Sequence, residues 1–464
     1  MTSKHPSRPT ARAPMHFAEP AVPGNGRGAH GRAGGSDSVQ DASGLARVVP
    51  VQRVQEPSVR QVRIGLILIW LCGLVLLAVV IALSWNSKPY WMDAEEYALS
   101  VAQGRWVVHP PGHIFFVATA RLFYALGVAN PYIALQMLTL SSTLGGMLLL
   151  YWLLREVVGS LQSSLLVFAF ALSWVPLLIN HTGTSSTSDF FTTPLLLWSA
   201  TRLTTRPTRS AAAMLGLAVF LCGGFRLTTL FMMVPLLVAV LWVNHRNPYV
   251  WIACAVSGLM VGLLQLLVIR VSGGWNLYSF MVWKQNFFRT YNLIDDFARP
   301  ALFNMGRSLI WFGLGTLVLP FALLRLRSPR PWNANQRVIL VYGALATAGP
   351  VAVCTLYLCE HPGYVAPALA GFYLCVAVAW NRAGSRLDFA KWPIAASIAS
   401  LLLFFSTHYY RTPTTRGQAI ANYLLLQYSA DGARHACYKT TSDWLRAAKD
   451  PQLNPSNADH AMER

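Results

Sequence analysis

Charged residues are scarce in this sequence: they make up 12% of its 464 residues, whereas an ordinary soluble domain carries about 25%. Hydrophobic residues make up 54% of the chain, and the mean hydropathy is +0.41. Hydrocarbon tolerates charged side chains poorly. The shortage of charge therefore excludes a typical soluble enzyme and indicates a chain that lies largely within a lipid bilayer.

Acidic residues are the scarcer of the two signs, with 18 Asp and Glu against 37 Lys and Arg. In a soluble protein, a net charge of +19 would suggest a nucleic-acid partner. Here the excess mostly reflects basic cytoplasmic ends of a membrane protein, so we expect no nucleic-acid role. The seven cysteines show no CxxC or Cys/His spacing, which excludes a typical structural zinc site.

What the sequence does contain is a series of apolar runs, most of them near the length of about 20 residues that a helix needs to cross a bilayer. A helix satisfies its backbone hydrogen bonds internally, as hydrocarbon requires. We therefore predict an all-α polytopic membrane protein with about eleven transmembrane helices. The predicted spans are residues 64–84, 131–154, 163–180, 190–203, 211–225, 227–243, 249–271, 304–324, 338–358, 364–381 and 391–409.

The two ends of the chain differ from this apolar middle. Residues 1–60 are rich in Pro, Gly, Ser, Ala and Arg and lack apolar periodicity, which predicts a disordered tail. Nine Lys and Arg against four Asp and Glu up to Arg63 place this basic tail in the cytoplasm. We predict a transmembrane domain over 61–410 and an extracytoplasmic tail or small cap over 411–464.

One further apolar stretch, residues 113–128, decides the topology. It is short for a span and carries Arg121. If it crossed the membrane, the basic clusters 202–209 and 325–337 would fall outside, against the positive-inside rule. We therefore expect it to lie in the outer interface, within a first outer loop that covers residues 85–130.

The acidic residues of the predicted membrane domain gather on the outer side in this topology. Nine occur between Ile64 and Tyr410, and only Glu156 and Asp388 fall inside. The other seven are Asp93, Glu95, Glu96, Asp189, Asp295, Asp296 and Glu360. A face that mixes both signs of charge next to a membrane is what a polar active site needs.

The first outer loop carries the most informative pattern. If residues 93–103 are helical, Asp93 and Glu96 share a face and Tyr97 lies beside them. Carboxylates held there could act as a general base or bind a divalent cation. Pro110 and Pro111 end any helix and would turn His109 back toward the carboxylates.

This layout, Asp93-x-x-Glu96-Tyr97 followed by His109-Pro110-Pro111-Gly112, resembles the GT-C glycosyltransferases, which include protein O-mannosyltransferases and the lipid A aminoarabinose transferase. The sequence departs from the O-mannosyltransferases because Ala94 follows Asp93, where they have an Asp-Glu pair. The resemblance implies a GT-C-like bundle with an interfacial helix in the first outer loop, in a bacterial inner membrane. It also implies a polyprenyl-phosphate sugar donor and an inverting transfer. Asp93 would be the catalytic base or a metal ligand.

The remaining candidate residues follow from the needs of such a transfer. Glu96 and Asp189 would support Asp93, and His109 would contact or orient the lipid phosphate. Asp93 and Asp189 would hold a divalent cation, Mg²⁺ or Mn²⁺. A phosphate leaving group also needs cations, and further substrate-binding candidates are Arg226, Lys284, Arg289 and His361.

Each candidate also has an ordinary structural interpretation. Asp189 could cap a helix, basic side chains could reach for lipid headgroups, and the His361-Pro362-Gly363 turn could simply end a span. Two other functions stay open at this stage, a transporter or flippase of a lipid-linked sugar and an inactive scaffold of the same fold. We expect membrane lipids as partners, while the acceptor could be a protein, a lipid or a glycan.

Overall fold

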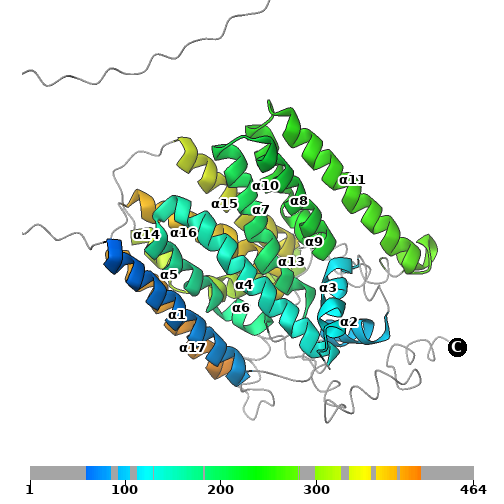
Figure 1. Ribbon diagram of the computed structural model, residues 1–464, viewed down its shortest axis with the longest axis horizontal. Coiled ribbons are helices and arrows are strands. Elements are labelled where there is room, and N and C mark those ends of the chain that lie inside the picture. Colours follow the sequence, from blue (N-terminus) through cyan, green and yellow to red (C-terminus); the bar gives the residue numbers. More distant parts are fainter. Residues whose placement is uncertain are drawn as a thin grey trace, which may run out of the picture. The chain divides into compact units, whose positions relative to one another are not determined.

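The computed structural model describes residues 59–84, 92–104, 112–128, 130–180, 183–280, 282, 298–325, 334–356, 362–383 and 387–408. All of these belong to one compact unit, Pro57–Arg464. Within the described residues the secondary structure is helical throughout, as predicted (Figure 1). The tail proposed for residues 1–60 and the cap proposed for 411–464 lie outside the described residues, apart from the start of α1.

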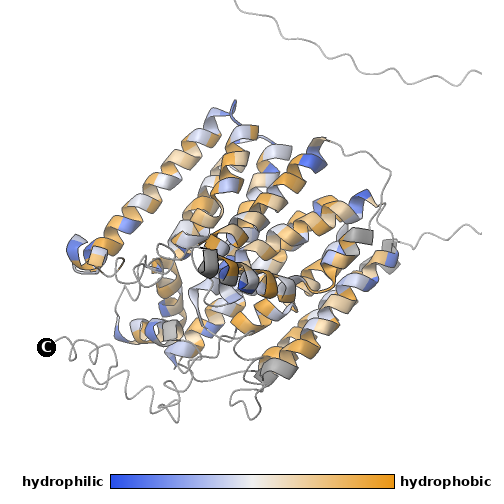
Figure 2. Ribbon diagram, turned by 180° about the vertical axis from the view of Figure 1, so that it is seen from behind, coloured by the Kyte–Doolittle hydropathy of each residue, from blue (hydrophilic) through white to orange (hydrophobic). Residues whose placement is uncertain are grey.

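Among the described residues, five segments are long and apolar enough to cross a bilayer. They are Ile64–Ala82 in α1 (Val59–Ser84), α4 (Pro131–Val158), α11 (Pro248–Val271), α15 (Ala334–Leu356) and Asp388–Phe405, which includes most of α17 (Lys391–His408). In Figure 2 the middle of these helices is mainly hydrophobic and polar colours gather toward helix ends. The chain is therefore an integral membrane protein, while the count of eleven spans stays a prediction.

The other described helices do not meet these criteria of length and composition. They are α2 (Met92–Gln103), α3 (Ile114–Ala125), α5 (Ser160–Ala171), α6 (Trp174–Ile179), α7 (Asp189–Thr205), α8 (Arg209–Phe225), α9 (Leu227–Met232), α10 (Val234–Val243), α13 (Ala298–Thr316), α14 (Leu319–Arg325) and α16 (Ala366–Arg382), with 3-10 turns η1 (Ser185–Ser188), η2 (Pro362–Tyr364) and η3 (Leu387–Ala390). The predicted span 163–180 is broken into α5 and α6, and 227–243 into α9 and α10. Pro176 and Pro235 lie just after these breaks. Proline has no N–H to donate to the preceding turn, so each proline favours a break in the helix at that point.

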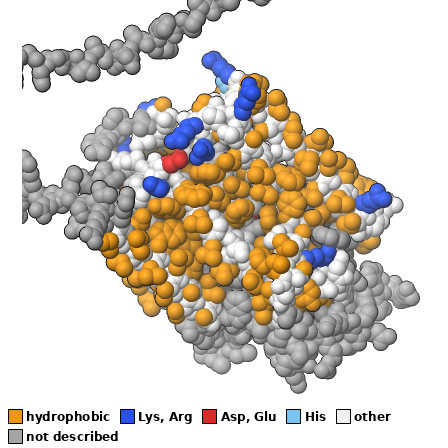
Figure 3. Space-filling view, viewed as in Figure 1, with side chains coloured by type: hydrophobic (Ala, Val, Ile, Leu, Met, Phe, Trp, Pro, Cys, Tyr) orange, Lys and Arg blue, Asp and Glu red, His pale blue; other side chains and the backbone are white. Residues whose placement is uncertain are grey.

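The centre of the bundle is formed by α4, α7, α15 and α16, which pack against one another, while α1 packs on α5 and α11 on α8. The central helices are more buried than those at the periphery. In α4, 61% of the membrane segment is buried, but only 11% of the α1 segment and 17% of the α11 segment are buried. Figure 3 shows a wide hydrophobic surface on one face of this bundle. These exposed apolar surfaces are suited to contact with lipid.

A glycine sets the distance between α4 and α7. A Cβ atom at Gly146 would collide with the backbone oxygen of Phe190, so only glycine lets the two helices approach so closely. Phe190 is the second residue of α7. Gly146 therefore helps to fix the position of Asp189, the first residue of that helix.

The segment predicted as the first outer loop contains two short helices that pack on each other and on α4. The helix expected over 93–103 is confirmed as α2, and its buried residues Ala94, Tyr97 and Val101 form a small apolar core with α3 and Tyr132. With 12 residues, α3 is about 18 Å long. That is well short of the hydrocarbon thickness of about 30 Å, so its length fits a helix that does not cross the membrane.

Candidate functional site

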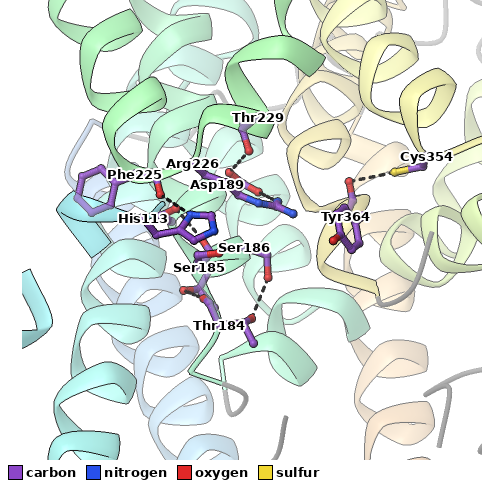
Figure 4. Close-up of polar contacts among 12 residues, drawn as sticks. His113, Thr184, Ser185, Ser186, Asp189, Phe225, Arg226, Thr229, Cys354 and Tyr364 are labelled. Carbon is purple, nitrogen blue, oxygen red and sulfur yellow. Dashed lines mark hydrogen bonds and ion pairs between the residues drawn. The ribbon is translucent and has the colours of Figure 1, made fainter. Parts of the chain in front are cut away.

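A buried ion pair joins the start of α7 to the end of α8. Arg226 Nη1 donates to Asp189 Oδ2 at 2.5 Å, and the hydroxyl of Thr229 donates to Asp189 Oδ1 at 2.6 Å. Asp189 is 1% exposed and Arg226 is 4% exposed. A charge buried this deeply requires a partner, and each carboxylate oxygen of Asp189 has one (Figure 4).

The position of Arg226 follows from a break in the chain. Its backbone is extended, with φ −156° and ψ 101°, between the end of α8 and the start of α9. The break directs the side chain toward α7 and leaves the carbonyl of Phe225 outside the regular helical hydrogen bonding. His113 Nδ1 lies 3.2 Å from that carbonyl oxygen, so an N–H at Nδ1 can donate to it. His113 therefore ties the start of α3 to the break.

The first outer loop reaches the same region through Tyr97. Its hydroxyl donates to Ser185 Oγ at 3.2 Å, and its ring meets the ring of His113 edge-on at 5.5 Å. Ser185 belongs to η1, the turn that leads directly into Asp189. The contact brings α2, which also carries Asp93 and Glu96, against the turn that positions the buried carboxylate.

A fourth segment approaches from the C-terminal half of the chain. The ring of Tyr364, in η2, lies 4.9 Å from the Cζ atom of Arg226, a distance at which a cation and an aromatic ring attract each other. Cys354 Sγ lies 3.3 Å from the carbonyl oxygen of Tyr364 and can donate to it, which links η2 to α15. Residues from α2 and α3, from η1 and α7, from the α8–α9 break and from η2 thus converge on one ion pair.

The glycine of the predicted His-Pro-Pro-Gly turn has a conformation that other residues rarely adopt. Gly112 has φ +85°, and a Cβ atom there would lie 2.7 Å from a methyl group of Val268. Both the backbone angle and the close neighbour exclude a larger residue without strain. This glycine precedes His113 and so helps to place it.

The structure describes some of the predicted site residues and not others. Asp189 and Arg226, which were predicted separately, are in direct contact, and Glu96 is half-buried on α2. Asp93 lies in the first turn of α2, one turn before Tyr97, but its side chain is outside the described residues. The candidates His109, Lys284, Arg289 and His361 also lie outside the described residues.

Three contributors to the site were missed as candidates from the sequence. Thr229, His113 and Tyr364 each make a contact described above. Local signals existed for all three, since Thr229 follows Arg226 by three residues, His113 follows the first Pro-Gly turn and Tyr364 follows the second. No signal in the sequence showed that these positions meet in space.

The divalent cation expected on Asp93 and Asp189 stays a prediction, because the side chain of Asp93 lies outside the described residues. Within the described part of the chain, no group of three or more His, Cys, Asp or Glu residues could hold a metal ion. Both oxygens of Asp189 already accept hydrogen bonds from Arg226 and Thr229. A metal ion at Asp189 would have to compete with this arrangement.

No protein-family model and no curated protein sequence matches the chain. Among solved structures, it is similar to ArnT from Cupriavidus metallidurans bound to undecaprenyl phosphate, with a TM-score of 0.50 and 15% sequence identity over 81% of this chain and 75% of that one. The apo state of the same ArnT gives a TM-score of 0.48 and 14% identity, with the same coverage. The chain therefore shares the fold of ArnT, a membrane aminoarabinose transferase, as expected from the resemblance found in the sequence.

Proposed function

We propose that this protein is a glycosyltransferase that moves a sugar from a polyprenyl-phosphate donor to an acceptor, with inversion. The observation that carries the proposal is the convergence of four segments on the buried Asp189–Arg226 pair in a chain with the fold of ArnT. That ArnT was crystallised with undecaprenyl phosphate. A donor of the same lipid-phosphate class supplies the anion that a buried guanidinium could recognise.

Arg226 keeps hydrogen-bonding capacity for such an anion. A guanidinium has five N–H donors, and Asp189 is reached through Nη1. Nε and Nη2 of Arg226 make no hydrogen bond within the described part of the chain. Asp189 would therefore hold the guanidinium in a fixed orientation while its remaining donors face the departing phosphate. Lys284, Arg289 and His361 are proposed as further phosphate contacts.

In the proposed reaction the acceptor hydroxyl attacks the anomeric carbon of the donor sugar. Asp93 accepts the hydroxyl proton, the new glycosidic bond forms, and the bond from the anomeric carbon to the phosphate oxygen breaks. The electron pair leaves with the polyprenyl phosphate, whose charge the cations stabilise. Glu96 and Asp189 support this arrangement, and His109 orients the phosphate. The reaction balances with these two substrates alone.

We place the site on the outer face of a bacterial inner membrane, with the N-terminus in the cytoplasm and eleven spans. The support is the distribution of charge in the sequence, since the basic connections gather on one side and seven of nine acidic residues on the other. The three-dimensional arrangement is consistent with one polar end, because α2, η1, the α8–α9 break and η2 meet there.

The decisive experiment uses the full chain, purified and reconstituted in liposomes, with a panel of undecaprenyl-phosphate sugars that includes hexoses and aminoarabinose. Release of undecaprenyl phosphate together with sugar transfer supports the proposal. Movement of the intact donor across the bilayer would instead identify a flippase. If neither sugar transfer nor movement of the donor occurs with any member of the panel, the result would identify an inactive scaffold. Asp93→Asn serves as the inactive control and Glu95→Gln as its matched partner.

A further inference from the structure

A cavity of about 450 Å³ lies between the far ends of α4 and α7. It is lined by Trp152, Arg155, Glu156, Trp198 and Arg202. Arg202 follows Asp189 by 13 residues on one helix, which corresponds to about 20 Å along its axis. The cavity is therefore separate from the polar site described above, at the other end of α7.

The cavity carries two basic side chains, Arg155 and Arg202. The guanidinium of Arg202 lies over the ring of Trp198, at 5.4 Å from its centroid. The side chains of Arg155 and Arg202 make no hydrogen bond or ion pair within the described part of the chain, although Glu156 lines the same cavity. Two unpaired guanidinium groups on one cavity favour a phosphate group as their ligand.

Aromatic side chains complete the cavity. The rings of Trp152 and Trp198 lie 6.2 Å apart, and Trp152 is 48% exposed. Tryptophan is enriched at the headgroup level of bilayers, and its ring face also attracts organic cations. Figure 3 shows basic side chains and an acidic one gathered at an edge of the hydrophobic surface.

An apolar path leads away from the cavity along α4. Trp152 is preceded at intervals of one turn by Leu148, which is 49% exposed, and Leu144, which is 37% exposed. Residues four apart lie on the same side of a helix. The cavity therefore opens onto a lipid-accessible stripe that could accommodate an acyl chain attached to the bound headgroup.

Glu156 restricts which headgroup charges the cavity can bind. A carboxylate beside two guanidiniums disfavours a second negative charge and attracts a cationic group. The cavity thus presents two positive charges and one negative charge, with aromatic faces between them. We propose that it binds the phosphoethanolamine headgroup of a membrane phospholipid, with the phosphate on Arg155 and Arg202 and the ammonium group near Glu156 and the tryptophan rings.

The test uses the purified full chain, stripped of lipid in detergent and titrated with phosphatidylethanolamine, phosphatidylglycerol or phosphatidylcholine while bound lipid is counted by native mass spectrometry. We expect phosphatidylethanolamine to bind most tightly. Arg155→Gln and Arg202→Gln should each weaken its binding by about tenfold, the effect of losing one charge-assisted hydrogen bond. Glycerophosphoethanolamine, the headgroup without acyl chains, should compete at high concentration.

Two matched variants make the test specific. Arg206→Gln removes the same charge one turn beyond Arg202, from an exposed residue that does not line the cavity, and should leave binding unchanged. Glu156→Gln should abolish the preference for phosphatidylethanolamine over phosphatidylglycerol and leave binding of the latter intact. Equal affinity for all three lipids, or equal weakening by Arg206→Gln, would overturn the proposal and indicate nonspecific headgroup contact. Thermal unfolding of each variant verifies that it is folded.

Discussion

Asp189 and Arg226 are 37 residues apart in the sequence, yet Oδ2 of one and Nη1 of the other are 2.5 Å apart. They meet because α7 and α8 are packed neighbours, and the first residue of α7 lies beside the residue that follows α8. Removing two charges from water costs about as much free energy as their attraction returns. The ion pair therefore adds little net stability, which makes a role in recognition the better explanation for its presence.

Removing one member of the pair should destabilise the protein strongly. Asp189→Ala leaves the buried guanidinium of Arg226 without its partner, and we expect a loss of about 3–5 kcal/mol. The measurement is thermal or denaturant unfolding of the purified protein in detergent. The double variant Asp189→Leu with Arg226→Met removes both charges and should recover most of the loss without recovering transferase activity. A double variant as unstable as the single one would contradict this account.

The contact between Tyr364 and Arg226 can be separated into its ring and its hydroxyl. Tyr364→Phe keeps the ring at 4.9 Å from the guanidinium and should therefore retain the cation–π attraction. Tyr364→Leu removes the cation–π attraction, which is worth about 0.5–2 kcal/mol. Unfolding of both variants is compared with the parent protein. Equal stability of the Leu and Phe variants would show that the ring contributes nothing through its π face.

The helical class and the resemblance to GT-C proteins could both be inferred from the sequence, because both depend on local patterns. Apolar run length identifies membrane helices, and the motif from Asp93 to Gly112 is contiguous. The helix over 93–103 was also predictable from local spacing, and α2 confirms it. Within the described residues, in contrast, five helical segments meet the criteria of length and composition for crossing a membrane. Several of the other predicted spans are short or broken helices.

The pairing of Asp189 with Arg226 could not be predicted from the sequence. Each residue was identified by its place at the end of an apolar run, but helix ends on the same side of a membrane are numerous. Which of them touch depends on helix packing, for example on the glycine at position 146 and the extended backbone of Arg226. Tyr364 was missed for the same reason, because its contact with Arg226 joins positions that lie far apart in the chain.

The close approach of α4 and α7 can be tested at neighbouring glycines. Gly146→Ala places a methyl group against the backbone oxygen of Phe190, which cannot move without displacing α7. Overpacking of this kind costs about 1–3 kcal/mol or more, and the shift should also lower activity through Asp189. Gly145→Ala is the control, because its Cβ atom would meet the side chain of Phe191 at 3.1 Å, which can adjust. Similar unfolding temperatures for the two variants would contradict this explanation.

The outer position of the α3–α4 connection can be tested by cysteine labelling in intact cells or oriented vesicles. Asn130 is a poor labelling site because it is buried and caps α4 by accepting a hydrogen bond from Tyr132 N. Leu126 is 74% exposed, so Leu126→Cys is the better choice. We expect a membrane-impermeant maleimide to label it from outside and to label Arg206→Cys only from the cytoplasm. The reverse pattern would refute the proposed topology.

The last prediction concerns Asp93, the proposed base. It lies in the first turn of α2, and Tyr97 one turn later anchors that helix to the turn before Asp189. Asp93→Asn keeps the size and hydrogen bonding of the side chain but removes its ability to accept a proton. We expect the rate of transfer from a polyprenyl-phosphate sugar to fall by about 10²–10⁴, with little change in expression or unfolding temperature.

Glu95→Gln is the matched control for Asp93→Asn, because it removes one carboxylate from the same turn of α2. Successive residues are about 100° apart around a helix of roughly 3.6 residues per turn, so Glu95 does not share the face of Asp93 and Glu96. It should therefore retain most of the activity. Full activity of Asp93→Asn would remove Asp93 as the base. An equal loss in Glu95→Gln would mean that the acidic cluster acts through its total charge, because a single proton acceptor would respond to one position only.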